Sequence, residues 1–476
     1  MSILGQKNFV GGYLLVLVLV FGSIFFLITA SFVGYIVTQS QLVQQKVDLQ
    51  RAGDVAEAGL NYYRWFLAHY PNDVTNGTGL PGPYVHTYFD PEGDAIGEFS
   101  LSVASTTYCG DISSLEVSST GFVYDNPDVR RTVKARYARP TVAEYSFILN
   151  ANVWAGADRV IVGPYHSNGG IRMDGSNNST VTSGQASWTC TPSFGCNPEG
   201  ARDGVFTTTA NPNTALFSFP HPPINFTGLS VDLAQMQDRA QNAGGIYIPP
   251  SGSFGYRVTF NGNGTFNVRR VNGTTLYWGY SVEHGFQQER HVISSTNTNT
   301  VYTINAECPL IFIQDKVWLD GVVDQKVTLA AADVASAAIN PSIILNDSIS
   351  YNSPDAGLLA IAEQDVLLGL VVPSNMIANG IYIAQNGRFS RNHYYDSGGY
   401  AIPVALRPYI LRDALTMNGT IVSNGRVGSQ WTSGGVPVSG FLNRVNTYDR
   451  NLVVDPPPLV PKTSDLYAIT DWRDER

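Results

Sequence analysis

Charged side chains that could do acid–base chemistry are concentrated in one stretch of the chain, which contains Asp315, Lys316, Asp320, Asp324 and Lys326. Carboxylates and amines on successive turns of a β-solenoid could form a groove that cleaves polysaccharide. Charges at such spacing are more commonly solvated surface groups. We therefore favour a surface role for this set and keep the enzyme as the alternative.

His166 is the most suggestive histidine, because it lies close to Asn168 and Arg172 in GPYHSNGGIR. We interpret it as a structural residue bonded to neighbouring strands. The acidic stretch 174–180 lacks the spacing of an EF-hand loop. The sequence contains no G-x-S-x-G motif and no Gly-rich phosphate loop that opens a helix. We therefore predict a protein that is not an enzyme, with no catalytic residue, metal or cofactor.

The four cysteines favour disulfide bonds over a metal site. Cys190 and Cys196 flank TPSFG, a short loop with Pro and Gly, so we predict a bond between them. Cys109 and Cys308 stand alone, and their pairing stays open. A zinc site would need closer pairs together with histidine.

The composition is typical of a β-rich, turn-rich exported protein. Only 14% of the 476 residues are charged, whereas 43% are hydrophobic. The net charge of -9 comes without a basic stripe, so we expect no nucleic-acid partner. Segments such as RFSRNHYYDSGGYAIP place Tyr beside Asn, which could serve binding of a surface glycan or a protein receptor. Core and turn roles are the commoner use of such residues.

An uncharged apolar run covers residues 13–37 and continues without a turn signal to His69. We predict one helix over 13–70. At 1.5 Å per residue its apolar half is about 38 Å long, enough to cross a bilayer core of about 30 Å. Lys7 before the span favours a single-pass membrane protein with a cytoplasmic N-terminus and an exported remainder.

The residues before the apolar run predict processing. The run is longer than the apolar region of an ordinary secretory signal. The segment 1–12 is a short polar leader that ends in Gly11-Gly12. This arrangement fits cleavage after Gly12, which would leave Tyr13 as the new N-terminus.

Heptad spacing in the second half of the helix predicts a packing seam. Its small members allow close approach of a sheet or another helix. We expect the lower part to pack on the chain's own sheet and the upper part on neighbouring subunits. The seam contains Leu42, Leu49, Ala52, Ala56, Gly59 and Tyr63.

The Gly-Gly, the apolar run and AGDVAEAGLNYYRW together resemble the start of a type IV pilin-like protein. The resemblance is strongest to PilX-type minor pilins and pilus assembly proteins, where an AxxAEAGL stretch follows the apolar helix; here it covers residues 52–60. Major pilins carry a glutamate at the fifth mature position, where this chain has Leu17. That difference favours a minor subunit at the filament tip.

The resemblance implies a mainly β protein with a helical stem and a small antiparallel sheet. The chain then shows short β runs separated by Asn-Gly turns, and Ser-Asn-Gly at 167–169 returns at 423–425. This pattern predicts a parallel β-solenoid with stacked asparagines at its corners, with a β-sandwich as the alternative. The expected divisions are a leader (1–12), the helix (13–70), the sheet (71–142), the head (143–455) with an insertion (176–245), and a Pro-rich tail (456–476).

The resemblance also implies the function and the partners. We expect a minor pilin or pilus assembly protein that is cleaved by a prepilin peptidase, held in the membrane by its helix and joined there by other pilin-like subunits. Its head would serve adhesion or assembly priming at the cell surface. The alternative is a membrane-tethered β-solenoid enzyme or binding protein that acts on polysaccharide.

Overall fold

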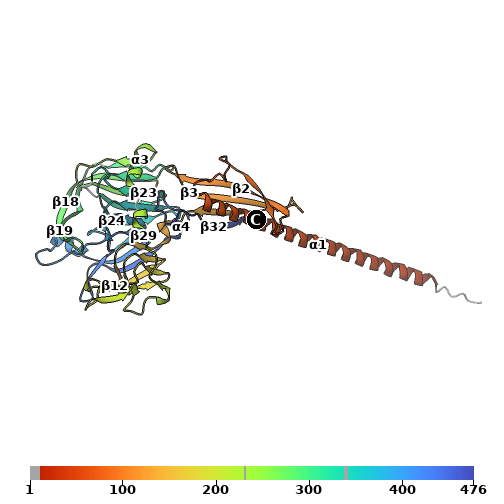
Figure 1. Cartoon of the computed structure of the whole chain (residues 1–476), viewed down its shortest axis with the longest axis horizontal. Helices are drawn as coiled ribbons and strands as arrows, with labels where there is room; N and C mark the ends of the chain where they lie inside the picture. The colour runs from red at the N-terminus through yellow and green to blue at the C-terminus, as the bar shows by residue number, and fades with distance from the viewer. Residues whose placement is uncertain (1–10, 230–231, 298, 337–340, 476) are drawn as a thin grey trace, which may run out of the picture. The chain divides into compact units, whose positions relative to one another are not determined.

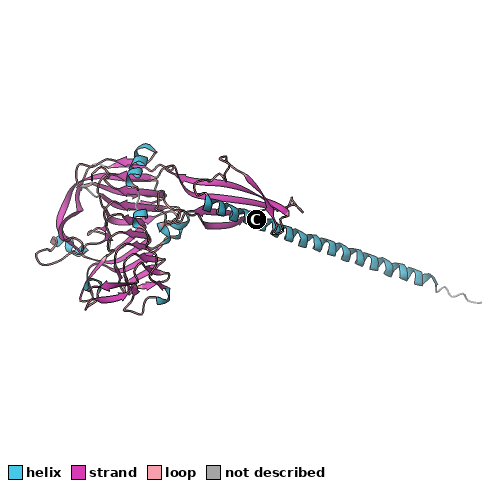
Figure 2. Ribbon diagram, in the orientation of Figure 1, coloured by secondary structure: helices cyan, strands magenta, loops and turns pink. Residues whose placement is uncertain are grey.

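The computed structural model describes residues 11–229, 232–297, 299–336 and 341–475. The chain is mainly β-strand, with one long helix near its N-terminal end (Figure 1; Figure 2). It forms two compact units. We call residues 1–103, 117–135 and 472–476 the stem unit, and residues 104–116 and 136–471 the head.

The long helix α1 covers Gly11–His69, as the sequence predicts. Its composition favours a helix because it contains no proline and few residues that compete for backbone hydrogen bonds. The helix ends just before Pro71, where the Tyr70 amide still donates to the Phe66 carbonyl at 2.8 Å.

A five-stranded sheet accompanies the helix, in the order β1-β2-β3-β4-β32. Its strands are β1 (Tyr84–Phe89), β2 (Ala95–Tyr108), β3 (Asp111–Val123), β4 (Arg130–Ala138) and β32 (Ala468–Glu475). The sequence predicts the small antiparallel sheet but misses β32, which belongs to the predicted Pro-rich tail. Within the stem unit, Arg131 forms an ion pair with Asp474 of that strand.

The predicted boundary at residue 142 differs from the observed division. The tip of the β2–β3 hairpin, residues 104–116, groups with the head, and the stem unit's β4 segment ends at Ala135. The disulfide Cys109–Cys308 lies wholly within the head, which explains why this hairpin tip belongs to it.

Most head strands pair in parallel. One ladder runs through strands of two to thirteen residues that pair in parallel. Its members are β16 (Ile246–Ile248), β21 (Leu310–Ile313), β23 (Lys326–Ala331), β25 (Gly357–Ala362), β27 (Asn375–Ala384), β29 (Leu411–Ser423), β5 (Phe147–Leu149), β8 (Tyr165–Ser167), β11 (Val181–Ser183) and β15 (Phe217–Ser218).

Further parallel ladders accompany the first one. A second ladder contains β17 (Tyr256–Asn261), β22 (Val317–Val323), β24 (Ile343–Tyr351), β26 (Val366–Leu368) and β28 (Phe389–Ser390). A third runs from β27 and β29 to β31 (Val436–Thr447), β7 (Arg159–Val162) and β10 (Ser176–Asn177). A short one contains β6 (Val153–Ala155), β9 (Ile171–Met173) and β14 (Val205–Phe206).

The order of strands in the first ladder is not the order of the chain. The chain enters at β5, in the middle, and builds outward through β8, β11 and β15. It then returns at the opposite end with β16 and builds back to β29, which pairs with β5. The predicted insertion at 176–245 is therefore partly wrong, because β11, β14 and β15 extend the ladders.

Asparagine and glycine mark the corners of the ladders, as the sequence predicts. The Asn150 amide donates to Asn424 at 2.8 Å, and the Asn168 amide donates to Asn150 at 2.9 Å, so three strands share one asparagine stack. Gly380 lies opposite Gly419, and a Cβ on Gly419 would lie 1.9 Å from the Gly380 carbonyl oxygen. Only glycine fits at that corner.

The remaining elements are antiparallel strands and short helices. An antiparallel hairpin with Asn-Gly in its turn forms between β17 and β18. The strands are β18 (Thr265–Ser281), β19 (Gly285–Thr296), β20 (Thr300–Thr303), β12 (Ser187–Cys190), β13 (Gly200–Asp203) and β30 (Gln430–Ser433), and the helices are α2 (Phe226–Leu229), α3 (Leu233–Asn242) and α4 (Arg450–Val454).

Candidate functional site

The first half of α1 exposes almost all of its large apolar side chains. Phe25 and Phe26 are 73% and 74% exposed, and the apolar residues from Tyr13 to Val37 share this exposure. It is the one helix of the described residues that is long and apolar enough to cross a membrane. Water is a poor solvent for such a surface, so this half of the helix needs an apolar partner.

The few polar side chains of this half are satisfied within the helix. The Ser23 hydroxyl donates to the Val20 carbonyl at 2.8 Å, and the Thr29 hydroxyl donates to the Phe25 carbonyl at 2.8 Å. Thr38 does the same to Gly34 at 2.9 Å. These hydroxyls therefore need no water, as a lipid environment requires.

Asp48 marks the change from the exposed half to the packed half. It is 3% exposed, and its carboxylate accepts hydrogen bonds from Gln44 at 3.0 Å and from Asn126 at 3.1 Å. Asn126 belongs to the turn DNPD between β3 and β4. The carboxylate therefore joins the helix to its own sheet.

The packed half of α1 lies against the sheet through small residues. Ala52 and Ala56 are fully buried, and a Cβ on Gly121 of β3 would lie 2.4 Å from the Ala56 amide nitrogen. A Cβ on Gly59 would lie 2.8 Å from the Phe99 ring. Helix and strand thus touch at backbone distance, and neither glycine can be replaced without movement.

Tyr63 closes this contact. It is fully buried, and its hydroxyl donates to the Val74 carbonyl at 2.8 Å. Beside it, the Tyr62 ring lies 4.4 Å from the imidazole of His86, and burial lowers the pKa of that imidazole. An aromatic cluster therefore secures the end of the helix.

The structure divides the predicted packing seam into two groups. Ala52, Ala56, Gly59 and Tyr63 pack on the chain's own sheet, whereas Leu42 and Leu49 are 48% and 44% exposed. Only the second group is available to another subunit.

The predicted processing site lies at the start of the described helix. Gly11 and Gly12 are helical, and Tyr13 is 78% exposed. Residues 1–10 of the predicted leader lie outside the described residues. Cleavage after Gly12 stays a prediction.

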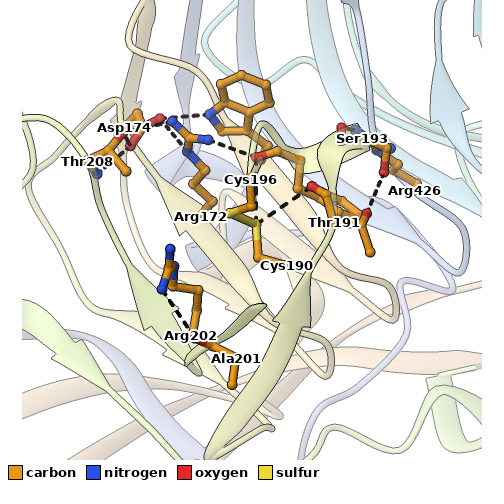
Figure 3. The surroundings of a disulfide bond; sticks show 12 residues. Arg172, Asp174, Cys190, Thr191, Ser193, Cys196, Ala201, Arg202, Thr208 and Arg426 are labelled. Carbon is orange, nitrogen blue, oxygen red and sulfur yellow. Dashed lines mark hydrogen bonds and ion pairs between the residues drawn. A yellow bond between two sulfur atoms is a disulfide. The ribbon is translucent and has the colours of Figure 1, made fainter. Parts of the chain in front are cut away.

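Both cysteine pairs are disulfide-bonded in the head. Cys190 and Cys196 form the predicted bond (Figure 3). Both cysteines belong to a small buried cluster with Trp188. Cys109 pairs with Cys308, and the Cys109 amide also donates to the Glu307 carbonyl at 3.0 Å. The sequence leaves this second pairing open because 199 residues separate the two cysteines.

A buried ion pair lies beside the Cys190–Cys196 loop. Arg172 contacts Asp174 at 2.7 Å, and its guanidinium also donates to the Phe194 carbonyl at 2.9 Å and to Thr208 at 2.7 Å (Figure 3). The Trp154 indole donates to the same aspartate at 2.9 Å. These bonds fix the loop and use the Asp174 oxygens, so they favour a structural role.

His166 has the structural role expected for it. Its ring nitrogens lie 2.8 Å from the Thr182 hydroxyl of the next strand and 2.9 Å from the Asn168 amide oxygen. Burial lowers the pKa of the imidazole, against the opposing effect of the Asn168 bond. The histidine thus bridges the β8–β11 rungs.

The Asp–Lys set does not form one groove. Asp320 is 2% exposed and pairs with Arg257 at 3.0 Å, whereas Lys326 lies 3.9 Å from Asp455. Asp315 accepts hydrogen bonds from the backbone and hydroxyl of Ser251. These separate partners remove the arrangement on which the polysaccharide-cleaving hypothesis was based.

Lys316 instead lines a polar cavity of about 270 Å³ with residues that the sequence did not single out. Glu289 and Asp365 also line it. Burial raises the pKa of Asp365, whereas for Glu289 hydrogen bonds from His291 and others outweigh burial and lower the pKa. No local sequence pattern marks this cavity, because its residues come from segments that are far apart in the chain.

Comparison with known proteins adds little to these observations. No family model and no curated protein matches the chain. One similar solved structure is the competence-associated pilin ComZ of Thermus thermophilus, with 12% identity, a TM-score of 0.28 and coverage of 90% of this chain and 97% of that chain. At that TM-score the likeness carries no argument, so the interpretation depends on this chain's own residues.

Proposed function

We propose that this chain is a minor pilin or pilus assembly protein of a type IV pilus-like filament. One observation carries the proposal: a single helix has an exposed apolar half and a half packed on its own sheet, divided at Asp48. This helix is held in lipid before assembly and among other helices after it.

The energetics agree with two apolar environments. Burying one large apolar side chain contributes about 1.5–3 kcal/mol relative to exposure in water. Residues Tyr13 to Val37 include many such side chains, all exposed in the single chain. When neighbouring helices replace lipid around these side chains, the side chains stay buried, and the subunit can leave the membrane without losing this contribution. Gly22 and Gly34 have no atom within 4 Å of an added Cβ, so they leave room for a close helix contact.

The proposal includes processing and position. A prepilin peptidase cleaves after Gly12, and Tyr13 becomes the N-terminus. Leu17, in place of an acidic residue, suits a subunit with no other subunit ahead of it, at or near the tip. The head then lies outside the cell for adhesion or assembly priming, and its two disulfides suit an oxidising compartment.

The test compares two equally drastic substitutions in the stem unit. Leu42→Glu places a charge on the proposed subunit contact, whereas Leu80→Glu, at a residue 67% exposed outside the helix, is the control. We expect Leu42→Glu to lose incorporation into filaments and Leu80→Glu to retain it, as measured by immunogold labelling. Equal incorporation of both variants would contradict the proposal. Ala56→Arg is a poor test, because Ala56 is fully buried against the sheet.

The polar cavity supports a second candidate function, a membrane-tethered enzyme that acts on polysaccharide. Glu289 and Asp365 line one cavity, where burial raises the pKa of Asp365 and hydrogen bonds lower the pKa of Glu289; acid–base pairs use such a difference between two carboxyl groups. Turnover of a glycan by the full chain that Glu289→Gln abolishes would favour this function over the first.

A further inference from the structure

A broad aromatic groove opens in the head next to the polar cavity; Tyr394 lines the groove, and its hydroxyl donates to Glu289 of the cavity at 3.2 Å. The volume of the groove is about 1120 Å³, above the usual range for a small-molecule pocket. Four separate segments contribute to it: the β18–β19 hairpin, the loop after β28, the 3₁₀ turn Val404–Tyr409 and the β30–β31 hairpin (Figure 1 labels β18 and β19).

The rings of the groove form one connected surface. Tyr280 lies 5.0 Å from Phe286 and 5.7 Å from Trp431, measured between ring centroids. Phe286 lies 5.5 Å from Tyr395, and His393 stacks on Trp431 at 5.3 Å. Tyr400 stacks on one face of Phe286, with 3.7 Å between the ring centroids, and Phe286 remains 36% exposed, so a ligand can reach the uncovered part of the ring.

The backbone beneath the rings holds them in place. The amides and carbonyls of Tyr280 and His393 bond to each other at 3.0 and 2.9 Å. The fully buried Arg391 donates to the Leu370 and Tyr409 carbonyls, and its own carbonyl accepts from the Trp431 indole at 2.9 Å. Binding would therefore cost little ordering of these side chains.

The polar groups of the groove are open and nearly balanced in charge. The hydroxyls of Tyr280 and Tyr395 have no hydrogen-bond partner in the described part of the chain. Asp396 and Arg407 both line the groove and offset each other. Burial lowers the pKa of His393 to about 4, so its ring is neutral near pH 7.

We infer that this groove binds a neutral oligosaccharide. Sugar rings present apolar C–H faces that stack on aromatic rings, and hydroxyls that exchange bonds with tyrosine, carboxylate and guanidinium groups. The groove offers both kinds of contact and no net charge. This inference names the site and the ligand class of the adhesive role proposed above.

The inference can be wrong while the proposed function is right, because sugar binding depends on the groove and filament assembly depends on helix α1. Incorporation of the chain into filaments depends on Leu42 and not on the groove. If the chain enters filaments normally but binds no sugar, only the inference is overturned.

Binding is tested with the full chain in a detergent without sugar groups, on an array of neutral and acidic oligosaccharides that includes chitohexaose, maltohexaose and heparin hexasaccharide. We expect neutral glycans alone to bind. Their apparent affinity should fall at least tenfold in Phe286→Ala and Trp431→Phe. The matched control is Phe254→Ala, a head residue with the same 36% exposure that does not line the groove, and it should stay within twofold.

Three results would overturn the inference. They are absence of any neutral-glycan signal, binding of acidic glycans alone, and equal affinity of the Phe286→Ala variant and the unmodified chain.

A second experiment distinguishes a sugar ligand from a protein receptor. Binding of the chain to immobilised mucin is measured before and after periodate oxidation, which destroys the sugars of the mucin. Binding that survives the oxidation would assign the groove to a protein. Tyr395→Phe, which keeps the ring and removes only the hydroxyl, should bind more weakly while the head stays folded.

Discussion

The two halves of α1 are one continuous helix but use their side chains in opposite ways. The half before Asp48 exposes large apolar residues and satisfies its hydroxyls internally. The half after it buries small residues against β3 at backbone distance. A helical seam is therefore not by itself evidence of a subunit contact, because Ala52, Ala56 and Gly59 of this seam pack on the chain's own sheet.

The largest expected effect comes from a methyl group added to the packed half. Gly121→Ala would place its Cβ 2.4 Å from the Ala56 nitrogen and 2.5 Å from the Ala52 oxygen. Neither backbone atom can yield easily, so we expect a loss of about 3 kcal/mol or more in stability of the stem unit. Hydrogen–deuterium exchange of α1 and β3 peptides measures this loss.

The matched control is Gly34→Ala in the exposed half, where nothing lies within 4 Å of the added Cβ. Alanine favours a helix over glycine by about 1 kcal/mol, so the isolated chain should be unharmed. Equal exchange in the Gly121→Ala and Gly34→Ala variants would remove the distinction between the two halves.

An intermediate effect is expected at the division itself. Asp48→Ala leaves the Gln44 and Asn126 amides without their carboxylate acceptor. Loss of such buried bonds costs about 1–3 kcal/mol. Exchange should increase in the β3–β4 turn, whereas Asp54→Ala, at an exposed position of the same helix, should change it little. An unchanged turn in Asp48→Ala would mean that the carboxylate does not join helix and sheet.

The smallest effect is a pH dependence of the stem unit at His86 of β1, which contacts Tyr62 in the packed half of α1. The pKa of His86 is lowered by burial in the folded chain, so the unfolded chain binds the proton more readily. Stability of the stem unit should therefore be full above the ordinary histidine pKa of about 6.5 and should fall as the pH drops below it. Exchange measured from pH 7 to pH 5 should show this loss, and His86→Phe should flatten it. A profile unchanged by His86→Phe would assign the dependence elsewhere.

Much of the fold could be predicted from local patterns. The uncharged run predicts the helix, and the repeated Ser-Asn-Gly predicts stacked corners at Asn168 and Asn424, which in the structure both bond to Asn150. The pairing of β5 with β29 could not be predicted, because it joins strands more than 250 residues apart and depends on the whole ladder. The β32 strand was missed because its alternation is short and follows a run of prolines.

The sites show the same limit. Heptad spacing found the seam, and its small members predicted that the lower part packs on the chain's own sheet. The spacing could not identify Gly121 as the contact, because that residue lies far from the seam in sequence. The aromatic segments were visible one at a time. Their meeting in one groove, with Tyr280 beside Trp431, depends on four segments that only the folded head brings together.

The central claim, that the exposed half of α1 contacts other subunits, is tested most directly by cross-linking. All four native cysteines are in disulfides, so a new cysteine provides a unique thiol. With Leu42→Cys, a thiol-reactive cross-linker should join the chain to another pilin-like subunit in assembled filaments, whereas Leu80→Cys should give no such product. Cross-linking at Leu80→Cys but not at Leu42→Cys would contradict the account.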